Sequence, residues 1–404
     1  MHKLIVVIFL CFPVLVHAQE VLTYQYVDSL TYDQYLRGEW DCLIQTGKKA
    51  LKQGIDFKYL QQRLGYAYYM KSDYYEAMRY YEKALTFDKL DEGSNLYLYY
   101  AGMNIGNIGY ARHYAGKLSS CLQKDLRQAA IKPVNAVDIE YSYKWNAEAT
   151  RSDPRYVRIG INTPLGYALN LYQSVSRFNQ YAVYQDDSYE YRSTIVQDEY
   201  YALLSANIDS RLGAEVGYHY VNAGFNTDYW DLTWEMVTQQ VDTLNYPGHL
   251  FYADIHYKWY RFNLGISGSV FTMNSGKTEQ VGLHLGVGLP GSHNLYLKNS
   301  VYCLNDDDGL RFVSSHSIGL LFWSKIWLEG DVTFGNQNNF SDMNGMYVYN
   351  SFDPTLFKAG STIFWYANKR FTLFANVALD IKQNAYLLNE YQQKSLAGGI
   401  IWKF

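Results

Sequence analysis

Proline, cysteine and charged residues are scarce in this chain. Its 404 residues include 7 prolines and 4 cysteines, and 18% of them are charged. So few prolines argue against a disordered or collagen-like chain. The cysteines form no CxxC pair and show no metal-ligand spacing, so we expect isolated buried thiols at Cys42, Cys121 and Cys303. The net charge of −4 does not suggest a nucleic-acid partner.

Long apolar runs are missing too, except at the start of the chain. Residues 4–16 are apolar, and residues 16–18 (VHA) have the small-residue pattern of a signal-peptidase site. We therefore predict a signal peptide at residues 1–18. The run is shorter than the ~20 residues that a membrane-spanning helix needs, and no later run approaches that length. These observations exclude a helical membrane protein and leave a secreted, periplasmic or outer-membrane protein.

Aromatic residues, in contrast, are abundant. They make up 17% of the chain, which has 42 tyrosines. Amphipathic rings are typical of proteins that meet a boundary between apolar and aqueous surroundings. An outer-membrane protein has such a boundary.

The first part of the chain repeats with a period of 34 residues. A shift of 34 aligns Trp40 with Tyr74 and Ala50 with Ala84. This is the helix-turn-helix period of the tetratricopeptide repeat. The middle copy resembles that family at its packing positions, where small residues let two helices approach and rings fill the groove between them. These positions are Leu64, Gly65, Tyr68, Ala77, Tyr81 and Ala84.

The middle copy departs from the family pattern at Gln61, where a tryptophan would open the repeat, and at Lys89, where a proline would close it. The resemblance implies a helical domain of about three repeats at residues 20–134. Such a domain either presents a concave surface to a peptide or partner protein or serves as a rigid spacer without a ligand.

From about residue 136 the pattern alternates with a period of two. In residues 251–259 apolar or aromatic side chains occupy the odd positions, and the even positions include Asp254, His256 and Lys258. About a dozen such segments, each roughly 10–13 residues long, match strands that cross a bilayer at a tilt. We therefore predict a transmembrane β-barrel at residues 135–404, with a soluble sandwich or soluble barrel as the alternative.

Turns and loops set the expected number of strands. Short joints alternate with longer polar stretches, among them 180–196, 225–248 and 337–353, and this gives 14 strands, or 12 if the first two form a periplasmic hairpin. An even number places both ends of the barrel in the periplasm. The last strand looks like the insertion signal of Gram-negative outer-membrane barrels, with lipid-facing residues at Leu396, Ile400, Trp402 and Phe404.

The residues expected to face the lumen carry both signs of charge. Among them are Asp254, His256, Lys258, Arg261, Lys325, Glu329 and Asp331. They form either a polar conduit or a wall of salt bridges that keeps the interior closed, and no ring of one sign indicates ion selectivity. Asp254 and His256 could form an acid–base pair, although chance explains them equally well.

Enzyme signatures are absent from the sequence. It contains no GxSxG, no HExxH, no phosphate-binding loop and no dinucleotide fingerprint. We therefore expect no catalytic residue, no metal and no cofactor.

The order of the two domains resembles envelope proteins that fuse periplasmic tetratricopeptide repeats to an outer-membrane barrel, such as exopolysaccharide exporters and YaiO-type barrels. This resemblance implies the export or docking of a polymer, with the repeats recruiting periplasmic or envelope proteins. Outer-membrane lipid and a polysaccharide are the other expected partners. The alternative is a non-conducting scaffold whose barrel only anchors the repeats.

Overall fold

The computed structural model describes residues 22–105, 107–126, 133–166, 168–185, 189–209, 211–231, 242–259, 261–289 and 293–404. The predicted signal peptide at residues 1–18 lies outside them. The chain forms two compact units, and the division falls between Tyr97 and Leu98. Within the described ranges, no helix is long and apolar enough to cross a membrane.

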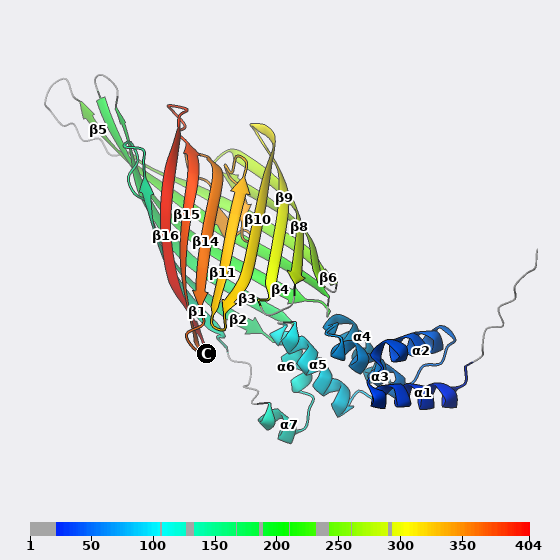
Figure 1. The fold of residues 1–404 in the computed structure, drawn as a ribbon. Helices are drawn as coiled ribbons and strands as arrows, with labels where there is room; N and C mark the ends of the chain where they lie inside the picture. The colour runs from blue at the N-terminus through cyan, green and yellow to red at the C-terminus, as the bar shows by residue number, and fades with distance from the viewer. Residues whose placement is uncertain are drawn as a thin grey trace, which may run out of the picture. The chain divides into compact units, whose positions relative to one another are not determined.

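Seven helices precede the barrel in the described part of the chain (Figure 1). Those that begin a repeat, α1, α3 and α5, start at steps of 34 residues, and so do α2, α4 and α6. The 34-residue period of the sequence is therefore a period of helix pairs. The bounds are α1 Tyr24–Arg37, α2 Trp40–Lys52, α3 Lys58–Met70, α4 Tyr74–Phe87, α5 Glu92–Asn104, α6 Ile108–Ala115 and α7 Ser120–Asp125.

Helix α4 begins at a side-chain cap and packs closely against α3. The Asp73 carboxylate accepts the Glu76 amide at 3.3 Å, which satisfies one of the free donors of the first turn. A Cβ on Gly65 would lie 2.9 Å from the ring of Tyr81, so only glycine allows this approach. All six residues at the predicted packing positions are buried, with exposed fractions of 8% or less for those other than Gly65.

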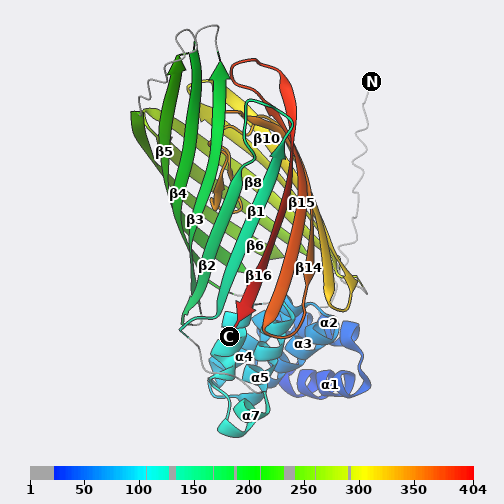
Figure 2. The same cartoon turned by 90° about the vertical axis from the view of Figure 1, so that its left-hand side faces the viewer.

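A closed antiparallel barrel of fourteen strands follows, which confirms the larger of the two expected numbers. Figure 2 shows β1 beside β16, where the barrel closes. The described bounds are β1 Ala136–Asn146, β2 Arg155–Leu165, β3 Leu169–Gln185, β4 Tyr189–Asn207, β5 Leu212–Asp231, β6 Asp242–Trp259, β7 Phe262–Met273, β8 Gly276–Leu289, β9 Leu295–Asp306, β10 Gly309–Trp323, β11 Ile326–Phe334, β14 Thr355–Trp365, β15 Phe371–Gln383 and β16 Glu390–Lys403. A separate two-stranded sheet consists of β12 (Ser341–Asp342) and β13 (Tyr347–Val348).

Polar and apolar side chains are distributed over the two faces of the barrel in the opposite way to a soluble protein. On β6, Phe251 and Ile255 point outward and are 62% and 56% exposed, whereas Tyr252 and Asp254 on the inner face are 6% and 8% exposed. A soluble barrel would cover apolar residues and expose polar ones. Apolar side chains outside and polar side chains inside are the pattern of a transmembrane barrel.

Two expectations about loops and thiols are wrong. Much of the stretches 180–196 and 225–248, expected as loops, belongs to the long strands β3 to β6, whose ladders continue to the pairs Gln185↔Glu190 and Thr227↔Asp242. Apolar alternation fades there because these strand ends extend past the apolar band. Cys42 and Cys121 are exposed rather than buried; Cys42 precedes the buried Leu43 by one position and so lies off the packed face of α2.

Candidate functional sites

The connection between β11 and β14 folds into the barrel. It consists of residues 335–354, includes β12 and β13, and is called the crossing segment below. In the closed strand order, β4 and β5 are the strands farthest from β11 and β14. Contacts between the crossing segment and β4 or β5 therefore show that the segment spans the lumen.

The tip of the crossing segment is bound to that opposite wall. The backbone carbonyl of Asn344 accepts the Tyr201 hydroxyl of β4 at 2.8 Å, and its side-chain amide donates to Glu215 of β5 at 2.6 Å. The Gly345 carbonyl lies 2.9 Å from Nδ1 of His219, also on β5. Tyr252 of β6 donates to the Asn344 side-chain oxygen at 3.2 Å. Four wall residues on three strands therefore hold one turn of the chain.

The middle of the crossing segment binds a third part of the wall. Ser341 donates its amide to Gln280 of β8 at 3.0 Å and accepts the Gln280 side-chain amide at 2.9 Å. Its hydroxyl lies 3.1 Å from that of Ser269 on β7. The neighbouring Phe340 is fully buried and contacts the ring of Tyr302 on β9. The segment thus crosses the lumen and makes specific contacts with several wall strands.

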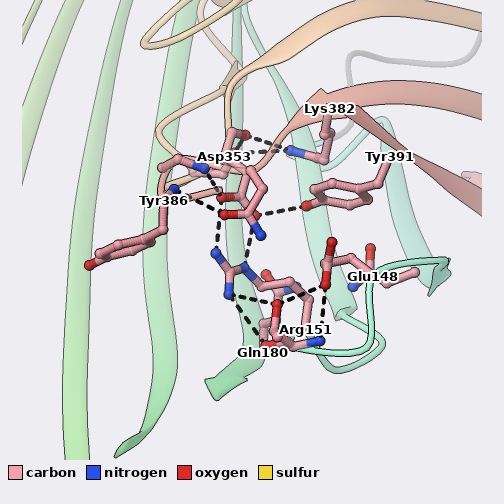
Figure 3. A network of polar contacts seen from close by, with 12 residues as sticks. Glu148, Arg151, Gln180, Asp353, Lys382, Tyr386 and Tyr391 are labelled. Atoms are coloured by element: carbon pink, nitrogen blue, oxygen red, sulfur yellow. Dashed lines mark hydrogen bonds and ion pairs between the residues drawn. The ribbon is translucent and has the colours of Figure 1, made fainter. Parts of the chain in front are cut away.

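The far end of the crossing segment is held at the mouth of the barrel by the Asp353 carboxylate (Figure 3). Arg151, from the β1–β2 connection, donates to both carboxylate oxygens, at 2.8 and 3.1 Å. Tyr391 donates at 2.8 Å and the Ala385 amide at 3.0 Å, while the Lys382 ammonium donates to the Asp353 carbonyl at 3.0 Å. Burial raises the pKa of Asp353, but the hydrogen bonds outweigh it and leave the pKa below its usual value.

The residues predicted to face the lumen divide into two groups. Asp254, His256, Lys258, Glu329 and Asp331 lie on strands, and Asp254 pairs with His256 at 2.8 Å. Arg261 and Lys325 instead lie exposed in the tight turns that follow β6 and β10, because these turns consume residues that alternation assigned to strand ends.

No set of three His, Cys, Asp or Glu side chains within the described ranges is arranged to hold a metal ion. The sequence also gave no signal for Arg151, Asn344 and Asp353, since each depends on a loop folding across the barrel.

A second candidate site, called the tyrosine groove below, is a groove of about 580 Å³ among helices α1, α3, α4 and α5. Most of its polar groups are phenols. Tyr66 packs edge-on against Tyr35 and Tyr97, with ring centroids 5.1 and 5.3 Å apart. The lining residues are Asp28, Ser29, Tyr32, Tyr35, Tyr59, Gln62, Arg63, Tyr66, Tyr81, Gly93 and Tyr97.

The charges of the groove compensate each other. Arg63 donates to the Asp28 carboxylate at 2.7 Å and to the Thr31 hydroxyl at 2.9 Å, and its guanidinium lies 5.1 Å from the centre of the Tyr32 ring. Burial raises the pKa of Tyr97 to about 12, which moves its ionisation further from neutral pH. A neutral groove of rings and hydroxyls suits an extended chain that offers both apolar surface and hydrogen-bonding groups.

No protein-family model matches this chain, and no curated protein does. Solved structures with a similar fold include the toluene transporter TodX of P. putida, with a TM-score of 0.46 and 6% identity over 68% of this chain and 91% of TodX. A bacterial polysaccharide outer membrane secretin has a TM-score of 0.39 and 9% identity, over 68% of this chain and all of the other. A Pseudomonas aeruginosa FadL homologue has a TM-score of 0.44 and 7% identity, over 67% and 90%. These values assign neither a family nor a function.

Proposed function

We propose that this chain is an outer-membrane protein of a Gram-negative bacterium. Its barrel exports or docks a polymer such as an exopolysaccharide, and its helical repeats recruit periplasmic partners. Support for the membrane comes from the apolar outer face, from the terminal aromatic strand and from the predicted signal peptide. Because Ala136 pairs with Lys403, both ends of the barrel lie at one rim; in an outer membrane this is the periplasmic rim, which supports a periplasmic location for the repeats.

The observation that carries the polymer proposal is a set of tyrosines on the lumen wall. Tyr172 on β3, Tyr201 on β4, Tyr252 on β6 and Tyr302 on β9 combine a ring face with a hydroxyl. Beside Tyr172, the charge of Arg158 is paired with Asp138 and Glu140. Rings and hydroxyls give a sugar chain many weak contacts, which a passing polymer needs in order to enter and to leave.

Polymer export is tested in a strain that lacks the chromosomal copy. Extracellular polysaccharide is measured after complementation with the wild-type chain, with the lumen variant Tyr172→Ala, and with the matched control Tyr200→Ala, whose side chain faces outward and is 38% exposed. We expect the lumen variant, but not the control, to retain polymer inside the cell. Unchanged extracellular polymer in the deletion strain would show that export is not the function.

The repeats are proposed to be tetratricopeptide-like and to bind an extended peptide of a periplasmic protein in the tyrosine groove. A groove that is neutral and aromatic offers ring faces and hydroxyls to a peptide backbone. We also propose that the chain is not an enzyme. The Asp254–His256 pair then serves the solvated lumen wall.

A non-conducting scaffold is the second candidate, and the crossing segment favours it, because the lumen is spanned in this structure. In that case the barrel only anchors the repeats in the membrane, and the groove between the helices binds the partner. A scaffold would lose its function with groove variants and keep it with lumen variants. The complementation experiment therefore separates the two candidates.

A further inference from the structure

We propose that the crossing segment, residues 335–354, is the gate of the barrel. It closes the lumen by binding to β4, β5 and β6, and it opens by withdrawing its tip from that wall without unfolding the strands. This inference rests on the proposed transmembrane barrel, but not on the identity of the passenger.

The segment leaves the wall at a fixed point. The last β11 residue, Phe334, pairs with Phe357 of β14, so the ladder is complete beside the point where the chain turns inward. Gly335 makes this turn with φ of +109°, and a Cβ there would overlap the Phe312 carbonyl oxygen. A glycine is therefore required, and it supplies the hinge.

The barrel wall does not depend on the segment for its backbone pairing. The ladders β10–β11 and β11–β14 run to Phe334, and each wall strand that the tip touches is paired on both sides. Withdrawal of the segment thus exposes wall side chains and leaves every strand pair intact.

The polar contacts of the tip can be exchanged for water. Asn344 and Gly345 meet the wall through the hydrogen bonds of Tyr201, Glu215, His219 and Tyr252. The apolar contact beside them comes from Met346 and Val348, which are only partly buried against the wall. A hydrogen bond lost to protein is recovered with water in a hydrated lumen, so the net cost of releasing such a contact is small. Polar attachment at the tip and a glycine at the base are the properties expected of an element that moves.

The Asn344–Glu215 contact provides the sharpest test. Asn344→Asp keeps the size of the side chain and places a second carboxylate where the amide donates to Glu215 at 2.6 Å. Adding Glu215→Gln removes the repulsion. The control is Asn376→Asp, the same change at a lumen residue that donates to Thr362 at 2.8 Å and lies outside the segment and its contacts.

The measurement is the KCl conductance of purified full-length protein in planar bilayers. We expect the wild type to be mostly closed and Asn344→Asp to conduct at least about tenfold more, while the double variant and the Asn376→Asp control return to the wild-type level. Equal conductance of the wild type and Asn344→Asp would contradict the proposal, as would an open wild type.

A reversible lock tests the same element independently. In a background without the native cysteines, Ser269→Cys/Ser341→Cys joins the segment to β7, since the two hydroxyls are 3.1 Å apart. Added to Asn344→Asp, the disulfide should close the barrel, and reduction should open it again. The control disulfide, Ser315→Cys/Thr333→Cys, links positions whose hydroxyls are 3.2 Å apart on β10 and β11 and should leave the barrel open. A locked barrel that still conducts would overturn the gate.

A third variant covers the case in which the tip tolerates the charge. Because Phe334 and Phe357 are paired, a short turn can replace residues 336–353. If that barrel resists SDS until heated and conducts no more than the wild type, the segment is not the gate. Failure of the membrane proposal has a different signature, since none of the proteins would then float with liposomes. Failure of polymer export leaves the KCl measurement unaffected.

Discussion

Arg151 and Asp353 are 202 positions apart in the sequence and form a two-point ion pair at the mouth of the barrel, with their side chains 3% and 5% exposed. The pair joins the β1–β2 connection to the end of the crossing segment. Two parallel hydrogen bonds fix the direction as well as the distance of the contact. The mouth therefore holds the segment's end in place while its tip reaches the opposite wall.

Breaking this pair should destabilise the mouth. Asp353→Asn leaves Arg151 buried without its counter-charge, and loss of one partner of a buried pair costs about 3–5 kcal/mol. Thermal unfolding in detergent measures the loss. Asp198→Asn serves as control, since its contact with Arg177 is exposed and should contribute at most about 1 kcal/mol. Equal effects of the two substitutions would mean that burial does not strengthen the contact.

The same carboxyl predicts a pH dependence. The pKa of Asp353 is lower in the folded protein than in the unfolded chain, so its ionised form stabilises the fold above the unfolded pKa of about 4. This stabilisation is lost as the pH falls through the folded pKa. The stability difference between wild type and Asp353→Asn, measured by unfolding from pH 7 downward, should shrink in acid. A difference that stays constant to pH 2 would contradict this assignment.

The helical repeats should fold without the barrel. Residues 20–134 are predicted to give a soluble fragment with a helical circular dichroism spectrum. Ala77→Leu and Ala84→Leu put extra volume between packed helices, where both alanines are fully buried, and should each cost about 1–3 kcal/mol. Leu90→Ala, at a side chain that is 81% exposed, should change stability by no more than about 0.5 kcal/mol. A β-rich spectrum would rule out the repeats.

Partner binding should depend on the tyrosine groove. Tyr66→Ala removes the ring between Tyr35 and Tyr97 and should reduce the yield of cross-linked periplasmic partners by about tenfold. Tyr26→Ala is the control, because Tyr26 is 52% exposed and lies outside the groove lining. If both variants capture partners like the wild type, the repeats serve as a spacer.

The two faces of a strand should respond differently to charge. Val377 on β15 is 57% exposed on the outer face, and Val377→Lys should cost about 2–4 kcal/mol near the middle of the bilayer. Asn376→Lys places the same charge in the lumen and should be tolerated. Unfolding from lipid vesicles measures both values. Equal losses would mean that the faces are assigned the wrong way round.

The outward row of strand β16 should direct assembly. Leu396, Trp402 and Phe404 belong to one outward row and are 43–48% exposed. Deleting Phe404, or changing it to Asp, removes one member of this row. We expect both variants to accumulate in the periplasm, as measured by membrane fractionation. Normal outer-membrane levels would show that Phe404 does not signal insertion.

Local patterns in the sequence determined that a helical part precedes a barrel, and they determined much of the strand pattern of that barrel. The 34-residue period fixed where helices begin, because helix pairs bury the same positions in each repeat. Period-two alternation fixed which strand residues face outward, because Phe251 and Asp254 must lie on opposite faces of any strand that contains them. Alternation did not identify the strand ends beyond the apolar band, since alternation in polarity stops where both faces are in water. It also assigned Arg261 and Lys325 to strands, although both lie in tight turns.

The tertiary structure alone decided that the crossing segment lies inside the barrel. Residues 337–353 have the composition of an outer loop, and nothing local distinguishes a loop that faces solvent from one that folds into a hydrated lumen. The contacts of Asn344 with Glu215 and of Arg151 with Asp353 join residues 129 and 202 positions apart. They require the closed barrel of fourteen strands, because closure sets the distance across which such a segment must extend.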